Sequence, residues 1–459
     1  MAPASRSWFA VLACLLLSVA SPAFTAERPN VVLVLFDDLG FGQPPGYDAA
    51  STFSMPAFEQ FSHEGMRFTD AHAAAAVCTP TRYGVLTGRY PARIGQFGVL
   101  TTFSKPIIPK SRTTVAAYLQ QQGYTTACVG KWHLGLSWEG GKPGSENRVP
   151  IGSRLTAGPN DLGFDYFCGF THARNIGTII EQDRVIEQVE PVENQPLMLE
   201  KALTWLDGRR SADQPFFLYF PMCPPHTPVV PAPEFIGQSG AEDLVGMDPR
   251  YGDWILQGDA MLGRLLDKLD ELGVADNTLV IVTSDNGAEG REYPPLRKSK
   301  RSIYEGGHRV PFVARWPGHV AAGSTCDATV CLNDLFATMA DILDAPPPAN
   351  AAEDSVTMLP LLLGEQSTPV RESTWHQSMQ GDIALRSGEW KLIIQKSGAR
   401  ELYNLRDDLS EKSDRASTDT ATAARLFDVL AREAEQGRST TGLQQPREYA
   451  FPQLKAAAR

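Results

Sequence analysis

The sequence predicts an α/β protein whose large domain is built on a mostly parallel central sheet flanked by helices. Residues 31–36 form an uninterrupted apolar run, which is typical of a parallel strand covered on both faces. Further strand-like runs alternate with helical patterns as far as residue 343, and such alternation is typical of a parallel sheet. Short strand-like pieces and one amphipathic helix follow, so we expect a smaller C-terminal subdomain with an antiparallel sheet and a helix.

The helices are predicted from their end signals and their apolar spacing. In the helix at 55–64, Ser54 can cap the first turn, Pro56 suits that turn, and Gly65 ends the helix. The longest helix, 254–272, repeats leucine at helical spacing. The other helices are expected at residues 115–122, 197–206, 334–343 and 421–435.

The strands are expected where short apolar runs end at polar or turn residues. Besides 31–36, these runs lie at residues 125–129, 216–220, 278–283, 310–316, 383–386 and 390–394. Residues 136–160 are rich in Gly, Pro and Ser, which predicts a long surface loop. The stretches 345–353 and 361–370 are expected to be irregular segments that precede the C-terminal part. We therefore expect a catalytic domain over residues 27–365 and a subdomain over residues 366–459.

The first residues of the chain, 1–26, have the pattern of a secretory signal peptide. Arg6 precedes an apolar run at 8–20, and small residues at 21–26 suit cleavage. The apolar run is too short to span a bilayer, and no second long apolar segment follows it. We therefore expect a secreted or periplasmic protein with no membrane partner.

The net charge argues against one class of partner, and the cysteines predict one disulfide and several buried thiols. With 42% hydrophobic and 21% charged residues, the 459-residue chain has the composition of an ordinary globular protein. Its net charge of −11 argues against nucleic acid as a partner, so an anion would need a local basic pocket. Export and short spacing predict a disulfide between Cys326 and Cys331, whereas Cys128, Cys168 and Cys223 are expected to be buried thiols.

Residues 77–82, Val-Cys-Thr-Pro-Thr-Arg, place a cysteine one helical turn before a basic residue. Pro80 in a first turn and Gly88 as a stop predict a helix that begins at Cys78. The free N–H groups and the dipole at that end favour an anion, and Arg82 adds a fixed positive charge. This chemistry suits a nucleophile aimed into an anion site, although a lone buried cysteine is more often a small apolar side chain.

Two pairs of polar side chains follow apolar strands of the predicted sheet. Asp37 and Asp38 come directly after residues 31–36, and Asp285 and Asn286 follow a later strand. In open α/β sheets, ligands gather beyond the carboxyl ends of the strands. Adjacent carboxylates repel unless a cation compensates them, and an all-oxygen set suits Ca²⁺ or Mg²⁺. The alternative is that both pairs are ordinary turn residues.

The Cys-x-Pro-x-Arg string, continued by Leu-Thr-Gly-Arg-Tyr-Pro at 86–91, resembles the signature of the type I sulfatases. In that family a formylglycine-generating enzyme oxidises the cysteine to formylglycine. The resemblance implies an alkaline-phosphatase-like fold and formylglycine at position 78. It also implies a bound divalent cation, Ca²⁺ with Mg²⁺ as the alternative, whose ligands are Asp37, Asp38, Asp285, Asn286 and residue 78 itself.

Three further strings look like those of the sulfatases: Gly-Lys-Trp-His-Leu-Gly at 130–135, Pro-His-Thr-Pro at 225–228, and the run 299–307. Taken alone, their basic residues would be read as surface or structural groups. The resemblance instead implies that the catalytic residues are Cys78, Arg82, Lys131, His133, His226 and Lys300. Strings at 385–391 and 401–405 extend the likeness to the C-terminal part.

The expected activity is hydrolysis of a sulfate ester carried by a small molecule or an oligosaccharide. Export, long Gly- and Pro-rich loops and polar residues favour a carbohydrate, with His172, Arg174 and Asn175 as pocket candidates. Two alternatives remain open at this point. One is hydrolysis of phosphonate monoesters or phosphodiesters in the same fold, and the other is non-catalytic binding of sulfate esters.

Overall fold

The computed structural model describes residues 28–210, 214–241, 244 and 247–458, so the predicted signal peptide at 1–26 lies outside it. A ten-stranded sheet with the order β13-β2-β12-β11-β1-β10-β4-β7-β8-β9 forms the centre of the large domain. The five central strands, from β11 to β7, run parallel to one another, as predicted. The strands are β13 (Ser324–Cys326), β2 (Met66–Phe68), β12 (Phe312–Arg315), β11 (Thr278–Ser284), β1 (Asn30–Asp37), β10 (Phe216–Pro225), β4 (Thr125–Lys131), β7 (Tyr166–Phe170), β8 (Thr178–Glu181) and β9 (Arg184–Gln188).

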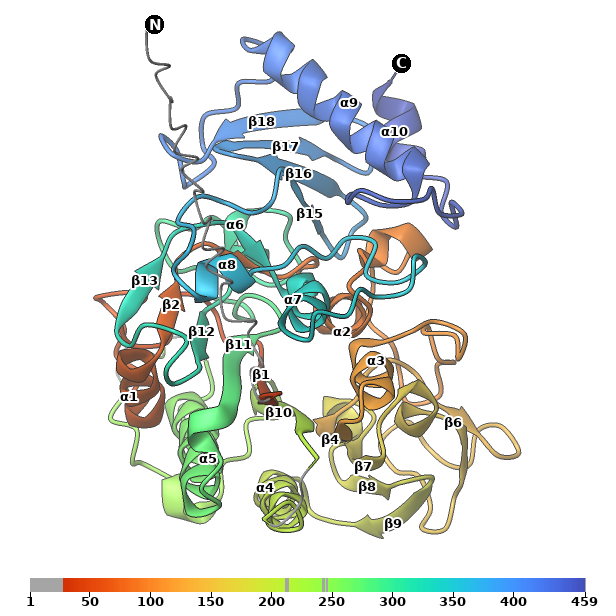
Figure 1. Cartoon of the computed structure of the whole chain (residues 1–459), viewed down its shortest axis with the longest axis vertical. Coiled ribbons are helices and arrows are strands. Elements are labelled where there is room, and N and C mark those ends of the chain that lie inside the picture. The colour runs from red at the N-terminus through yellow and green to blue at the C-terminus, as the bar shows by residue number, and fades with distance from the viewer. Residues whose placement is uncertain (1–27, 211–213, 242–243, 245–246, 459) are drawn as a thin grey trace, which may run out of the picture.

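Strand β1 separates two apolar cores, one on each face of the sheet (Figure 1). Val31 and Leu33 join one core, and Val32 and Val34 join the other, because successive side chains of a strand point to opposite faces. The first core contains helices α2 (Cys78–Thr87), α3 (Val115–Gln121) and α7 (Leu335–Ile342). The second contains α1 (Pro56–Glu64), α4 (Pro191–Asp207) and α5 (Tyr251–Glu271).

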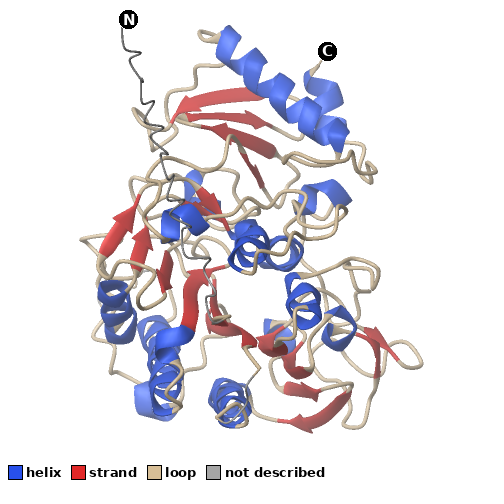
Figure 2. Cartoon of the chain, viewed as in Figure 1, coloured by secondary structure: helices blue, strands red, loops and turns tan. Residues whose placement is uncertain are grey.

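A second, four-stranded antiparallel sheet forms the C-terminal part of the molecule, as predicted. Figure 2 shows this sheet with the long helix α9 (Thr420–Gln436) laid against it. Leu426 and Leu430 of α9 pack with Leu385, Leu392 and Leu402 of the sheet in a third core. The strands are β15 (Thr374–Gln377), β16 (Ile383–Ser387), β17 (Trp390–Ile394) and β18 (Arg400–Asn404). The short helices are α6 (Glu305–His308), α8 (Leu359–Leu362) and α10 (Pro452–Ala457).

Two elements differ from the sequence prediction in extent. Helix α4 begins at Pro191 and not near residue 197, because Pro191 occupies its first turn and Glu193 accepts a hydrogen bond from the Glu190 N–H at 2.9 Å. The predicted loop at 136–160 contains a small antiparallel pair, β5 (Ser137–Trp138) and β6 (Leu155–Ala157). Such short strands carry too few residues for their alternation to stand out in the sequence.

The predicted disulfide between Cys326 and Cys331 is wrong, since both are free thiols. Cys326 ends β13, which pairs with β2 in the central sheet. Cys331 lies in β14 (Val330–Cys331), which pairs with β3 (Ala71–His72) in a separate two-stranded sheet. The chain passes from one sheet to the other between the two cysteines, and short spacing in sequence does not by itself supply disulfide geometry.

A buried charge network joins the large domain to the C-terminal sheet. Lys391 of β17 bonds to Glu305 of α6 at 3.0 Å and to Glu411 at 2.8 Å, and all three side chains are 0% exposed. Truncating Lys391 would leave the buried Glu411 without its cation, and Glu305 with Arg309, at 3.4 Å, in its place.

We therefore expect Lys391→Met to lower the free energy of unfolding by about 3 kcal/mol or more. Denaturant unfolding measures this directly. The control is Lys412→Met, at an exposed lysine that directly follows Glu411 in the sequence. This variant should change the free energy of unfolding by less than about 0.5 kcal/mol. Equal stability of the Lys391→Met variant and the wild type would show that this network does not hold the two parts together.

Within the described part of the chain, no helix combines the length and the apolar character needed to cross a bilayer.

Candidate active site

Cys78 is the first residue of α2, as the sequence predicts. Val77 before it is extended, and Gly88 ends the helix in the left-handed conformation with φ of 63°. The Cys78 Sγ atom lies 3.2 Å from His133 Nδ1. Burial raises the pKa of the Cys78 thiol, against the opposing charges of Lys131 and Lys300. The unmodified thiol is therefore protonated and a weak nucleophile at neutral pH.

The two acidic pairs meet at the carboxyl edge of the sheet. Strands β1 and β11 are parallel neighbours, so the residues that follow them come together. The Asp38 N–H donates to Asp285 Oδ1 at 3.1 Å, and Asn286 Nδ2 donates to Asp38 Oδ1 at 2.8 Å. Asp38 has a φ of 70°, a left-handed conformation that aspartate tolerates better than most residues and that is frequent at functional sites.

This group of oxygens has the properties of a cation site. Asp37 Oδ1 and Asn286 Oδ1 are buried and accept no hydrogen bond from the described residues. Ligand atoms of Asp37, Cys78 and Asp285 lie within 4.8 Å of one another. Burial, together with the negative charge of Asp37, raises the pKa of Asp285 to about 7 although Arg82 opposes it. A hard divalent cation would compensate this crowded charge, so the donor set fits Ca²⁺ or Mg²⁺.

Two lysines, Lys131 and Lys300, pair with the carboxylates of the first acidic pair. Lys131, the last residue of β4, donates to Asp37 Oδ2 at 2.5 Å. Lys300 donates to Asp38 Oδ2 at 2.7 Å and forms a second ion pair with Glu289 at 3.1 Å. Burial alone would lower the pKa of Lys300, but these carboxylates raise it above its ordinary value. Both lysines are therefore fixed positive charges.

Arg82 is wholly buried and faces the acidic pairs. Its Nη2 atom bonds to Asp285 Oδ2 at 2.8 Å, and its Nη1 atom bonds to the Lys131 carbonyl at 3.0 Å. The same Nη2 lies 3.5 Å from Asp37 Oδ1. Arg82 therefore ties the helix of Cys78 to the ends of β1, β4 and β11 and holds two carboxylates in place.

Two histidines complete the site. His133, with a φ of 57°, places Nε2 3.0 Å from the Leu100 carbonyl and Nδ1 toward Cys78. A proton on Nε2 satisfies the carbonyl and leaves Nδ1 free to accept one. Burial, then the charge of Lys131, keeps the pKa of His133 well below its ordinary value. His226 follows β10, and its Nε2 lies 3.7 Å from Asp38 Oδ2.

A cavity of about 430 Å³ opens above these groups. Five of the predicted catalytic residues line it, namely Cys78, Lys131, His133, His226 and Lys300. Arg82 and the two acidic pairs do not line it. Of the three pocket candidates, His172 and Arg174 also line the cavity. His172 stacks on His133 with ring centroids 5.4 Å apart.

Asn175 was predicted to shape the pocket, and that prediction is wrong. It is fully buried, and its amide accepts a hydrogen bond from Thr171 at 2.9 Å and donates one to Thr178 at 3.0 Å. These bonds hold the turn between β7 and β8. No residue of the loop at 136–160 lines the cavity, although Glu146 lies 3.4 Å from His172.

Glu289, which is not predicted from the sequence, lines the cavity and pairs with both Lys300 and Arg301. Its only signal in the sequence is that it lies four residues after Asp285. A glutamate in a loop is ordinary, so nothing local distinguishes it.

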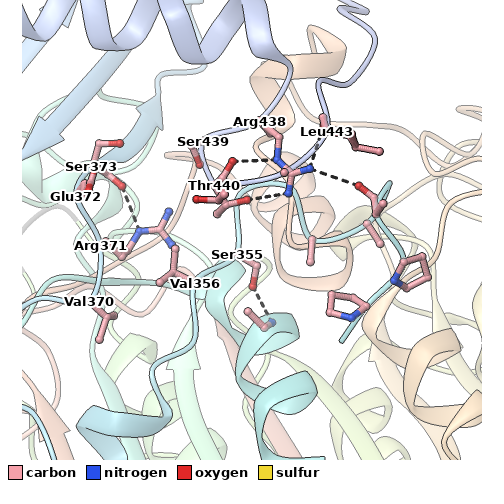
Figure 3. A pocket seen from close by; sticks show the side chains of 18 residues that line it. Ser355, Val356, Val370, Arg371, Glu372, Ser373, Arg438, Ser439, Thr440 and Leu443 are labelled. Atoms are coloured by element: carbon pink, nitrogen blue, oxygen red, sulfur yellow. Dashed lines mark hydrogen bonds between the residues drawn. The ribbon is translucent and has the colours of Figure 1, made fainter. Parts of the chain in front are cut away.

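A larger cavity, of about 700 Å³, lies away from this site, where the stretch after α7 meets the C-terminal part (Figure 3). Its most prominent cation, Arg438, already donates to the Thr440 and Leu443 carbonyls. No cluster of carboxylates or histidines accompanies it among the described lining residues. Among the described residues, the clusters of carboxylates, histidines and cysteine lie elsewhere, at the smaller cavity and around His72.

Comparison with known proteins agrees with this geometry. The family model described as Sulfatase matches residues 29–345. A second model, described as N-sulphoglucosamine sulphohydrolase, C-terminal, matches residues 298–437. Together they cover the central sheet, the site and most of the C-terminal part.

Individual relatives have similar lengths and folds. An N-acetylgalactosamine-6-O-sulfatase of Bacteroides thetaiotaomicron is 30% identical, over 88% of this chain and 93% of its own. Human arylsulfatase A is 34% identical over 82% of this chain and 77% of its own. A structure solved in work on glycosaminoglycan metabolism by Bacteroides thetaiotaomicron superposes with a TM-score of 0.80 at 28% identity, covering 89% of this chain and 99% of that one. The chain therefore belongs to the type I sulfatases, sulfuric ester hydrolases with the alkaline phosphatase fold.

Proposed function

We propose that this enzyme hydrolyses the sulfate ester of a sulfated carbohydrate, with formylglycine at position 78 and Ca²⁺ held by Asp37, Asp38, Asp285 and Asn286. The observation that carries the proposal is the position of Cys78, which lies at a helix N-terminus between two buried lysines and an acidic cluster. The proposal also includes export of the chain and its maturation by a formylglycine-generating enzyme. Mg²⁺ is the alternative cation, because the oxygen donors suit both ions.

When bound, the cation would act as a Lewis acid, and hydrated formylglycine would provide a hydroxyl nucleophile. The side chains of this protein then have separate tasks. Lys131 and Lys300 bind the sulfate oxygens and neutralise the charge that develops on them. Arg82 positions Asp285 and the Lys131 backbone and does not line the cavity.

The two histidines are assigned to proton transfer. His133 Nδ1, 3.2 Å from the side chain of residue 78, is placed to accept a proton from it. His226 lines the same cavity and is assigned the donation of a proton to the departing alcohol, a task for which Lys300 is the alternative. Burial lowers the pKa of His226, against the charges of Asp38 and Asp37, which favours its neutral form before substrate binds.

A carbohydrate substrate is supported by hydrogen-bonding side chains among the cavity lining and by the relatives. His172, Thr101 and Glu289 offer donors and acceptors around the opening, as a pocket for hydroxylated rings requires. One similar protein is an N-acetylgalactosamine-6-O-sulfatase that aligns with most of this chain.

We expect sulfate esters to be preferred over phosphonate monoesters and phosphodiesters. A sulfate monoester carries one negative charge, whereas a phosphate monoester approaches two at neutral pH. Three buried cationic side chains and a divalent ion would face three carboxylates, a balance that suits a monoanion and disfavours phosphate monoesters. Phosphonate monoesters and phosphodiesters are monoanions as well, so the preference for sulfate over them rests on the sulfatase relatives. Comparing kcat/KM for sulfated saccharides, an aryl sulfate, a phosphonate monoester and a phosphodiester tests this.

At least one sulfated saccharide should give the highest kcat/KM of that panel. A phosphonate or diester that exceeds every sulfate ester would establish the alternative hydrolase activity. Binding of sulfate esters without turnover, in protein whose residue 78 is shown to be formylglycine, would establish a binding protein instead.

A further inference from the structure

A second cavity adjoins the catalytic one. It has a volume of about 420 Å³ and shares Lys300 and Arg301 with the catalytic cavity. One wall is the segment 300–304 of the large domain. The other wall comes from the C-terminal sheet, where the β15–β16 turn and the ends of β17 and β18 supply Gln380, Asp382, Gln395 and Glu401. The two cavities therefore lie in succession, with Arg301 at their boundary.

The cations at this boundary are already matched by carboxylates. Lys300 pairs with Asp38 at 2.7 Å and with Glu289 at 3.1 Å. Arg301 forms a short ion pair with the other oxygen of Glu289. Lys300 is thus directed to the catalytic carboxylates and Arg301 to Glu289, and no unpaired cation is present among the described residues that line the second cavity.

The far wall carries two carboxylates that pair with no cation among the described residues. Asp382 accepts hydrogen bonds from Ser378 Oγ at 2.7 Å and from the Lys396 N–H at 2.9 Å. Glu401 accepts hydrogen bonds from the hydroxyls of Tyr304 at 2.9 Å and Tyr403 at 2.6 Å. Glu401 also accepts a hydrogen bond from the Gln395 side-chain amide. Both carboxylates retain oxygen lone pairs to which a further donor can bond.

Gln380 adds both a donor and an acceptor to the same wall. Its side chain is exposed. The backbone N–H donates to Ser378 Oγ at 3.2 Å, but the side-chain amide makes no hydrogen bond to any residue that the structure describes. A group that offers hydroxyls could therefore satisfy this amide and the two carboxylates together.

We propose that the second cavity binds an uncharged sugar unit next to the one that carries the sulfate, an inference that rests on the proposed function. Sugar hydroxyls donate to carboxylates and exchange hydrogen bonds with amides, which are the groups present on this wall. A second sulfate or a uronate at the same position would face Asp382 and Glu401 without a free cation, and such unpaired like charges reject a ligand. The substrate is thus a chain whose sulfated unit adjoins a neutral one.

The experiment compares substrates that share one sulfated sugar: the monosaccharide, the same sugar extended by a neutral sugar, and the same sugar extended by an anionic sugar. Each extension is made in two forms, one joined at the reducing end of the sulfated sugar and one at its non-reducing end. Because a few hydrogen bonds are gained, the neutral extension should raise kcat/KM about tenfold in the wild type. The anionic extension should give no increase. Formylglycine at position 78 is confirmed by mass spectrometry in every preparation.

Two variants test the wall itself. Gln380→Ala and Asp382→Asn should each reduce the gain from the neutral extension to about threefold or less, since each removes one hydrogen-bonding partner. The monosaccharide rate should be unchanged. Asp382→Asn should also raise kcat/KM for the anionic extension. Gln444→Ala, at an exposed glutamine that does not line the cavity, is the control, and melting temperatures confirm that all variants are folded.

Equal kcat/KM for the monosaccharide and for every neutral extension would overturn the inference, as would a wild-type preference for the anionic extension. Those results leave the proposed function intact, because the monosaccharide is still hydrolysed. Failure to hydrolyse any of these substrates, with formylglycine present, would instead contradict the proposed function.

Discussion

Cys78→Ala should abolish turnover of every sulfate ester while the protein stays folded. Alanine cannot be converted to formylglycine, so the proposed nucleophile is lost, and loss of a nucleophile typically costs a factor of about 10⁴ or more in kcat. The side chain is small and 1% exposed, so its truncation should cost only about 1 kcal/mol of stability. An aryl sulfate assay and a thermal melt measure the two effects separately.

The same experiment has a direct chemical readout and a matched control. Peptide mass spectrometry of active enzyme from a competent host should show formylglycine at position 78. Cys128→Ala removes another fully buried thiol, in β4, and should retain most of the activity. Wild-type turnover in the Cys78→Ala variant would refute the proposed mechanism.

Removing the Asp285 carboxylate should release the cation and the activity together. Asp285 is the central member of the acidic group, since it contacts both the Asp38 N–H and Arg82. We expect Asp285→Asn, which keeps the shape and removes one charge, to weaken cation binding and to lower kcat about 100-fold or more. Asp285→Ala should have a larger effect, because it also removes the side-chain oxygens that could bind the cation and accept hydrogen bonds from Arg82.

Elemental analysis of the purified variants, and turnover as a function of added Ca²⁺ or Mg²⁺, measure the two losses. A chelator should lower both turnover and the melting temperature of the wild type, because a ligand that binds only the folded state stabilises it. The control is Asp354→Ala, at a buried carboxylate that pairs with Arg93 far from the site in sequence. It should destabilise the protein without lowering the metal content of the folded fraction. Turnover that is insensitive to the chelator would contradict the assignment.

Much of the local structure could be predicted from the sequence. The start of α2 at Cys78 and its end at Gly88 follow from a proline in the first turn and a glycine that tolerates positive φ. The apolar run that became β1 and the leucine spacing of α5 likewise mark these elements. In each case the deciding interactions lie within one turn or one strand, so neighbouring residues carry the information.

Tertiary structure alone decided which of these elements meet. The parallel register of β1 and β11 places Phe36 opposite Ser284, and this brings together carboxylates about 250 positions apart in the chain. Strand pairing with β2 and β3 separates Cys326 and Cys331 onto two sheets. Hydrogen bonds to Thr171 and Thr178 make Asn175 a support for a buried turn. The second cavity depends on how the C-terminal sheet packs against residues 300–304. No local pattern encodes such contacts, because they form only when distant segments bury their apolar faces against each other.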